Sequence, residues 1–397
     1  MNNTCRKYLG IALFGLSVTA MAQPRWQVDP AHLPPAMSAE KAAAILEEID
    51  RKTTGELAAE EAAQQRKAER VQRAARKYEE RLARTVEKDP ELRALKEKLE
   101  AGMKALDNPA LSEEQRRERL ERMAPDMKAL RSKGLAKAGI DVRAMNGEIR
   151  RALNGGVTPR GEAAGEEEGM LQEEDGAFYY KTAADDELPP ASKVTTRGTN
   201  TITLTAPWPY AEERTPISGT DSYVDKDAGE YKAVAKARYV GYGTNYRGLA
   251  HFQPVPQGTT MIRVTAQLPE TEFYNSAWAF AAGGAQSRSF SIIEVWAANQ
   301  ERICRKYVSH ANVWAVVVGY FRQAGSESII LECPVEEDKV PAGEEVVIKF
   351  LSGASVQAWG AGSAYSRAKG KPADITVELI SPDPTFSIPQ RYYTLPR

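Results

Sequence analysis

The sequence predicts an α+β protein of several domains, in which a charged α-helical hairpin or bundle precedes an antiparallel, jelly-roll-like β-sandwich. Three observations lead to this fold class. Apolar residues recur every three or four positions through residues 38–155, which is the period of an amphipathic helix. From residue 199 onward apolar and polar residues alternate, as they do in half-buried strands. A chain of 397 residues also exceeds the size of one ordinary core.

Residues 1–22 have the pattern of a secretory signal peptide. Arg6 and Lys7 precede an apolar run, and Ala20-Met21-Ala22 supplies the small residues that a signal peptidase cuts after. We therefore expect cleavage after Ala22 and a periplasmic or secreted protein. The alternative is an uncleaved membrane anchor, but the apolar run has roughly a dozen residues where a spanning helix needs about 20. We accordingly expect no membrane insertion once the signal is removed.

The helical region is predicted over residues 38–155. Ser38 caps its first helix, Thr53–Gly55 interrupts that helix, and Asp89-Pro90 begins a new one. Ser112 and Asp141 mark two later helix starts. Because the helices on either side of Asp89-Pro90 both carry apolar stripes, we expect an antiparallel, coiled-coil-like hairpin. Such a module suits spacing or homo-oligomer assembly.

Three other stretches lack a regular period. Residues 23–37 are rich in proline and are predicted to be extended. Residues 156–197 carry 4 lysines and arginines against 10 aspartates and glutamates, a composition typical of a solvated, flexible linker. The tail, residues 381–397, combines prolines with aromatic residues and is expected to dock onto the β-domain or to be offered to a partner.

The β-sandwich domain is predicted over residues 198–380, with about ten short strands separated by glycine-containing turns such as Ala282-Gly283-Gly284. It contains both cysteines that remain after signal cleavage, Cys304 and Cys333. An even pair in an exported protein predicts a disulfide, with two buried free thiols as the alternative. The bridge would close a loop of about 30 residues and contribute roughly 3 kcal/mol.

The candidates for catalysis and cofactor binding are few. The chain has three histidines and lacks the common nucleophile, zinc, phosphate and dinucleotide motifs, so we predict no cofactor. No segment has the strong basic excess of a nucleic-acid-binding protein. Glu294 is the weak catalytic candidate, because strand alternation places it beside Trp296 and other apolar residues, where burial would raise its proton affinity. A salt bridge to Arg238 or Arg263 is the alternative.

Ligand-binding candidates come from two stretches of the β-domain. Gly241–Gly248 is interpreted as a loop that carries polar and aromatic groups, and Tyr274, Trp278 and Phe280 share one face of a strand. The alternative for the strand residues is a sandwich core. The predicted ligand-binding set is Tyr242, Asn245, Tyr246, Arg247, Tyr274, Trp278 and Trp296. Asp225 and Asp227 match half of a calcium loop and are weak metal candidates, with a simple turn as the preferred interpretation.

The sequence therefore predicts an exported, non-enzymatic binding or assembly protein. The helices would mediate oligomerisation or spacing, and the β-sandwich would recognise a glycan or a protein ligand. Two alternatives stay open. One is a secreted hydrolase that acts on polysaccharide through Glu294 and a second carboxylate, and the other is a purely structural protein of the cell envelope.

Overall fold

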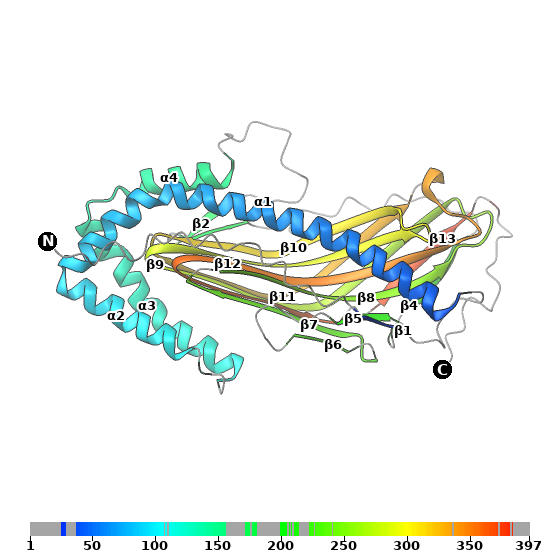
Figure 1. The fold of residues 1–397 in the computed structure, drawn as a ribbon, viewed down its shortest axis with the longest axis horizontal. Helices are drawn as coiled ribbons and strands as arrows, with labels where there is room; N and C mark the ends of the chain where they lie inside the picture. The colour runs from blue at the N-terminus through cyan, green and yellow to red at the C-terminus, as the bar shows by residue number, and fades with distance from the viewer. Residues whose placement is uncertain are drawn as a thin grey trace.

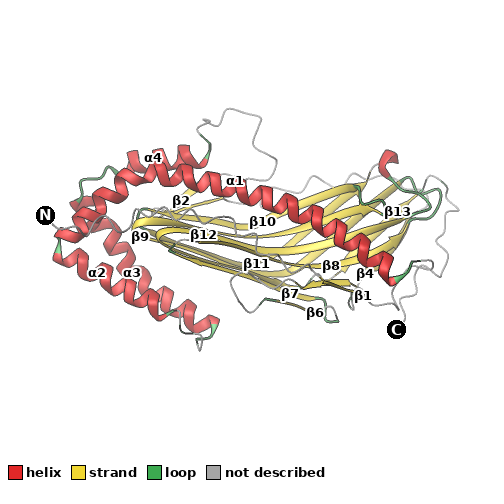
Figure 2. Ribbon diagram, in the orientation of Figure 1, coloured by secondary structure: helices red, strands yellow, loops and turns green. Residues whose placement is uncertain are grey.

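The computed structural model describes residues 25–28, 37–106, 108, 111–155, 171–174, 177–180 and most of 199–383. Within these residues four helices precede a largely antiparallel β-domain that forms a nearly closed sandwich (Figures 1 and 2). The predicted α+β fold class is thus confirmed. The predicted signal peptide, most of the acidic stretch and most of the C-terminal tail lie outside the described residues.

The elements follow one another as β1 (Arg25–Val28), α1 (Ala39–Lys88), α2 (Pro90–Ala105), α3 (Glu113–Lys137), α4 (Val142–Leu153), β2 (Leu171–Glu174), β3 (Ala177–Tyr180), β4 (Thr199–Leu204), β5 (Tyr210–Glu213), β6 (Tyr223–Asp225), β7 (Glu230–Arg238), β8 (Gly241–Pro254), β9 (Met261–Ala297), β10 (Arg302–Val316), β11 (Gly319–Val335), a 3-10 turn (Glu337–Lys339), β12 (Glu345–Gly370) and β13 (Asp374–Ile380). Two of these strands, β2 and β3, fall within the stretch predicted to be a linker, and β3 pairs with β10.

Helix α1 is one continuous helix of 50 residues, so the predicted interruption at Thr53–Gly55 is wrong. Threonine and glycine lower helix stability by up to about 1 kcal/mol each, which is why the sequence suggested a break. Tertiary contacts offset that cost here. The Thr53 hydroxyl donates to Glu294 of the sheet, and the Thr54 hydroxyl hydrogen-bonds Tyr246.

The helix boundaries of α2, α3 and α4 agree with the predicted caps. Asp89 accepts the Leu92 N–H, Ser112 forms a capping box with Gln115, and Asp141 accepts the Ala144 N–H. The hairpin was predicted between the helices on either side of Asp89-Pro90, α1 and α2, but the partner that α2 takes in an antiparallel hairpin is α3. Two interhelical ion pairs show this orientation, because Lys137 reaches Asp89 at 2.6 Å near one end and Lys98 reaches Asp126 at 2.8 Å further along.

The two longest strands, β9 and β12, fold back on themselves at one end of the molecule (Figure 1). Asn275 shows the fold-back in β9, because its amide donates to Ser289 at 2.7 Å and accepts from Ser287 at 2.9 Å. Residues 12 to 14 positions apart can meet in this way only if the strand reverses between them. The predicted turn at Ala282-Gly283-Gly284 is therefore the bend of one long strand.

Each fold-back carries the chain from one layer of the sandwich to the other. The first layer contains β8, the Glu345–Gly360 part of β12, the Gly284–Ala297 part of β9, and β10. The second layer contains β7, the rest of β12, the Met261–Ala279 part of β9, and β11. A Cβ atom at Gly284 would overlap the Trp359 ring, so the crowded bend requires a residue without a Cβ.

Between the layers lies an apolar core that the disulfide crosses. Cys304 of β10 and Cys333 of β11 are bonded, with their Cα atoms 5.9 Å apart, which confirms the predicted pair. Cys304 lies opposite Val295 and Cys333 opposite Val264, so the bond ties the first layer to the second. The two cysteines lie near the ends of β10 and β11 that are far from the turn joining these strands.

Removing the disulfide is expected to lower the free energy of unfolding by roughly 3 kcal/mol, because the reduced unfolded chain regains the entropy of a loop with a sequence separation of 29 residues. Urea unfolding of the Cys304→Ser/Cys333→Ser variant measures the loss. Reductant should destabilise the native protein by a similar amount and leave the variant unchanged. Equal unfolding midpoints for the native protein and the variant would contradict the prediction.

The helices wrap around the β-domain. The first part of α1 covers the outer face of the first layer, where Ile45, Leu46 and Ile49 pack with Phe252 and Trp296. At the folded-back end, all four helices contribute to one apolar cluster with the ends of the strands. The α2–α3 hairpin lies beside the second layer (Figure 1) and is held there by Arg131, which donates to the Val318 carbonyl, and by the Glu121–Arg322 ion pair.

Candidate ligand-binding cavity

The stretch Gly241–Gly248 is part of strand β8 and pairs with β12 over its whole length, so its interpretation as a loop is wrong. Asn245 and Arg247 are buried. The Arg247 guanidinium donates to the side-chain oxygen of Asn245 and to the Ser222 carbonyl, and the Asn245 amide donates to the Ser222 hydroxyl. Tyr246 is buried beneath α1. Only Tyr242 of this set is exposed, with 57% of its surface accessible. The stretch therefore brings no binding group to the surface except one tyrosine.

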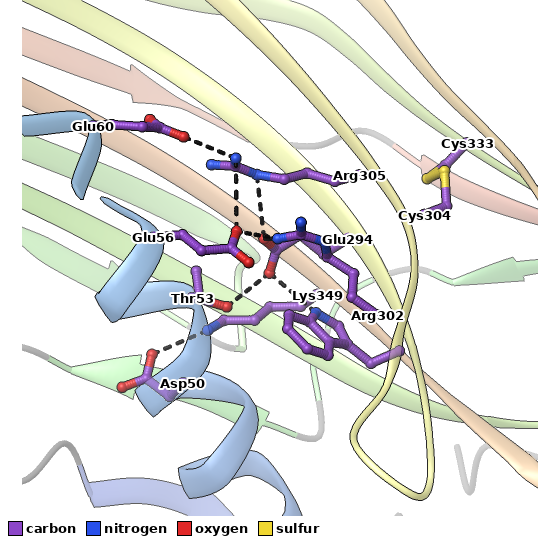
Figure 3. A network of polar contacts seen from close by, with 11 residues as sticks. Asp50, Thr53, Glu56, Glu60, Glu294, Arg302, Cys304, Arg305, Cys333 and Lys349 are labelled. Atoms are coloured by element: carbon purple, nitrogen blue, oxygen red, sulfur yellow. Dashed lines mark hydrogen bonds and ion pairs between the residues drawn. A yellow bond between two sulfur atoms is a disulfide. The ribbon is translucent and has the colours of Figure 1, made fainter. Parts of the chain in front are cut away.

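Glu294 lies at the centre of a buried polar network between α1 and the first layer (Figure 3). Its carboxylate accepts from Thr53 at 2.9 Å and from the Trp296 indole at 3.1 Å. Its charge is balanced by Arg305 at 3.4 Å and Arg302 at 3.9 Å. The suggested partners Arg238 and Arg263 are wrong, since the two arginines come from β10, which runs beside β9.

The same network extends along α1 to further charged residues. Arg302 pairs with Glu56, and Arg305 pairs with Glu60 at 2.8 Å. One turn earlier, Asp50 of α1 meets Lys349 of β12 at 3.0 Å, and both side chains are almost completely buried (Figure 3). Glu294 is fully buried in a site filled by cations and donors. This arrangement fastens α1 to the sheet.

A buried Ser291–His310 pair also has the atoms of a nucleophile and its base. The Ser291 hydroxyl lies 2.8 Å from His310 Nε2, and the imidazole stacks on Phe273. Both side chains have no accessible surface in the folded chain, because they lie between the two layers. A nucleophile must reach its substrate, so this pair is part of the sandwich interior.

A cavity of about 660 Å³ lies between the α2–α3 hairpin and the outer face of the second layer. This volume is within the usual range for small-molecule sites, roughly 300–1,000 Å³. Strand alternation turns Glu272, Tyr274, Ser276 and Trp278 of β9 to the same side, and all four line the cavity. Met103 and Leu120 of the hairpin supply apolar wall. Two of the predicted ligand-binding residues, Tyr274 and Trp278, are thus brought together here.

The floor of the cavity is a grid of side chains from three adjacent strands. The β12 residue Tyr365 lies opposite Ser276 of β9 on one side and opposite Lys236 of β7 on the other. Ser363 lies between Trp278 and Arg238 in the same way. Directly opposed side chains on a sheet are about 5 Å apart. The grid therefore places rings, hydroxyls and cations within reach of one small molecule.

Ser276 Oγ and Trp278 Nε1 are buried polar atoms of the cavity lining that have no hydrogen-bond partner among the described residues. Each of the two residues is only 1% exposed. A buried donor or acceptor without a partner costs about 1–3 kcal/mol. Each of these residues therefore leaves a hydrogen-bonding group unpaired at the wall of the cavity, among the described residues.

The sequence pointed to part of this site and missed the rest. Tyr274 and Trp278 were found because they recur on one strand face. Tyr365 was missed, although Ser363, Tyr365 and Arg367 alternate with small residues and carry the same strand signal. Trp296, the remaining candidate, packs beneath α1 and donates to Glu294. The residues that α2 and α3 contribute to the cavity could not be predicted, because a stripe of apolar residues on a helix predicts only that this face packs against something.

Asp225 forms a turn between β6 and β7. Its carboxylate accepts the N–H groups of Asp227 and Ala228 at 3.0 Å each, which is an Asx-turn geometry. The part of the chain that the structure describes contains no group of three or more His, Cys, Asp or Glu side chains arranged to hold a metal ion. Among the described helices, none is both long enough and apolar enough to cross a bilayer.

No family model matches the chain, and no curated protein matches it. Solved structures that align with parts of it have very low similarity. The enzymatically active domain of a bacteriophage CBA120 tailspike protein aligns at 8% identity and a TM-score of 0.14, over 38% of this chain and 19% of that one. An arabinose-bound α-L-arabinofuranosidase aligns at 10% identity and a TM-score of 0.12, over 43% and 28%.

A third structure is a carbohydrate-binding module of the β-sandwich superfamily. It aligns at 10% identity and a TM-score of 0.12, over 53% of this chain and 93% of that one. TM-scores this low do not identify a common fold, so function is argued from the cavity alone.

Proposed function

We propose that this chain is an exported, non-enzymatic binding protein whose ligand is a glycan held in the cavity between the α2–α3 hairpin and the second layer. The observation that carries the proposal is the lining: Tyr274, Trp278 and Tyr365 lie beside Ser276 and Ser363 in a space of about 660 Å³. Aromatic rings pack on the apolar faces of sugars, and hydroxyl and indole groups bond their hydroxyls.

The arrangement favours binding over chemistry. The weak catalytic candidate Glu294 is buried under α1 in the first layer, away from the cavity lining. Of the two carboxylates in the cavity lining, Glu272 is ion-paired with Arg367 at 3.5 Å. A glycosidase needs two carboxylates that flank the scissile bond, and this ion pair already occupies one of the two. Homo-oligomer assembly through the helices stays a prediction.

A glycan-array screen with the mature chain, followed by calorimetry on the best hit, tests the proposal. Tyr365 is half-buried and contributes its ring to the floor, so Tyr365→Ala is expected to weaken binding about tenfold or more by loss of stacking. The matched control is Tyr242→Ala, since Tyr242 is an exposed tyrosine outside the cavity. It should bind normally.

Thermal unfolding of both variants separates binding from folding. The proposal requires that Tyr365→Ala lose affinity while its midpoint stays close to that of the Tyr242→Ala control. Unchanged glycan affinity in Tyr365→Ala, or a mature chain that binds no glycan on the array, would overturn it.

A further inference from the structure

The lining of the cavity carries a net positive charge, whereas the whole chain is slightly negative. Its lining contains four basic residues, Arg116, Lys236, Arg238 and Arg367, and two acidic residues, Glu114 and Glu272. The formal balance is therefore +2, whereas the entire sequence carries −1. Cations that gather in a partly enclosed cavity act in a lower dielectric than surface charges, so their attraction for an anion is stronger.

These cations come from both sides of the cavity. Lys236 and Arg238 alternate along β7, where the Lys236 ammonium lies 5.6 Å from the centre of the Tyr365 ring. This contact places a positive charge over the Tyr365 ring of the floor. Lys236 lies opposite Tyr365 and Arg238 lies opposite Ser363, so these two cations come from the β7 side of the floor.

Arg116 faces them from the hairpin. Its Nη2 donates to the Asn108 carbonyl at 2.8 Å, which fixes the guanidinium group in position. Its Nε is buried and has no hydrogen-bond partner among the described residues. Arg116 also lies in the first turn of α3, where the helix dipole places partial positive charge. An arginine whose guanidinium group is held in position in this way suits a carboxylate of a ligand.

We infer that the ligand of this cavity is an acidic glycan, one that carries a carboxylate, and that Arg116, Lys236 and Arg238 select it over neutral sugars. This inference rests on the proposed function and adds the ligand class. The aromatic floor packs against the sugar, and the basic residues on the two walls hold its acid group.

The test uses pairs of ligands that differ only in charge. Oligomers of galacturonate, glucuronate and mannuronate are each compared with their methyl esters by calorimetry on the mature chain. Esterification keeps the ring and removes the anion. At least one acid is expected to bind about tenfold or more tightly than its ester. Raising the salt concentration from about 50 to 500 mM should weaken binding of the acid and leave binding of the ester unchanged.

Charge-removing variants identify the residues. Arg116→Gln and Arg238→Gln should each reduce the preference for the acid over its ester about tenfold, without changing affinity for the ester. The matched control is Arg51→Gln, because Arg51 is an exposed arginine on α1 that pairs with Glu48 and does not line the cavity. Its preference should equal that of the native chain, and thermal unfolding confirms that each variant is folded.

The outcomes separate this inference from the proposal beneath it. If esters or other neutral glycans bind as tightly as the acids, the acidic specificity is overturned while glycan binding stands. If an acid is preferred but Arg116→Gln and Arg238→Gln behave like Arg51→Gln, the assignment of these residues is overturned. If no glycan of either kind binds, the proposed function fails and the inference fails with it.

Discussion

Replacing Lys349 with methionine is expected to lower the free energy of unfolding by about 3–5 kcal/mol. Lys349 and Asp50 are both almost completely buried, and their charged groups lie 3.0 Å apart between β12 and α1. Methionine has a similar length but no charge, so it would leave the Asp50 carboxylate in a low-dielectric site without its cation. Urea unfolding at pH 7, followed by circular dichroism, measures the loss.

Two further variants separate charge from packing. Asp50→Leu combined with Lys349→Met removes both charges and is expected to recover most of the stability, since a buried pair is often no better than apolar residues of similar size. Arg51→Met breaks the Arg51–Glu48 pair one residue away, where the arginine is 71% exposed, and should change the stability far less than Lys349→Met does. Equal losses of stability for Lys349→Met and Arg51→Met would contradict the conclusion that the buried Asp50–Lys349 pair causes the large loss.

The second large effect is a dependence of stability on pH that comes from Glu79. Burial on the inner side of α1 is the main cause that raises the pKa of Glu79 from 4.5 to about 7. The neighbouring Glu80 carboxylate adds to this shift, and the Trp359 indole and Arg76 oppose it without cancelling it. The folded chain therefore keeps the Glu79 proton at pH values where the unfolded chain has released it. Stability contributed by the neutral carboxyl is complete below about pH 4.5 and is lost as pH rises through about 7.

Glu79→Gln tests this prediction because glutamine has the shape of the neutral acid and does not ionise. At pH 8 the variant is expected to be more stable than the native chain by about 3 kcal/mol, and at pH 4.5 the two should be close. Unfolding in urea at several pH values between these limits gives the curve. The matched control is Glu80→Gln, which removes an exposed carboxylate beside Arg76.

A Glu79→Gln variant whose stability runs parallel to the native curve at every pH would show that Glu79 is not the titrating group. A Glu80→Gln curve that flattens in the same way would point to the general negative charge of this helix region. Either result would remove the buried carboxyl as the cause.

Helix starts were predictable because capping is a local interaction. Ser38, Asp89, Ser112 and Asp141 each bond a backbone N–H three positions along the chain, so the pattern and its cause lie within one turn of helix. The disulfide was predictable for another reason, since only Cys304 and Cys333 remained to pair after the predicted cleavage. The alternation of apolar residues likewise predicted strands such as β13.

The predicted break in α1 was wrong because the residues at that position are stabilised by partners far away in the sequence. Thr53 and Asp50 look like part of an ordinary solvated helix face, yet they meet Glu294 and Lys349, 241 and 299 positions later. No local pattern contains that information. The charged middle of α1 therefore suggested an independent helical module, whereas in the structure it packs along the sheet.

Local sequence was sufficient to predict the class of most elements, the helix caps, the disulfide and several strand faces, because these depend on neighbours within a few residues or on the number of cysteines. Which faces of the sheet are open depends instead on contacts between segments far apart in the chain. Tyr246 and Tyr274 lie on similar alternating strands, but α1 covers the first, while the α2–α3 hairpin leaves a cavity over the second. That difference arises because strands that fold back place one chain in two layers, and each outer face meets a different helix.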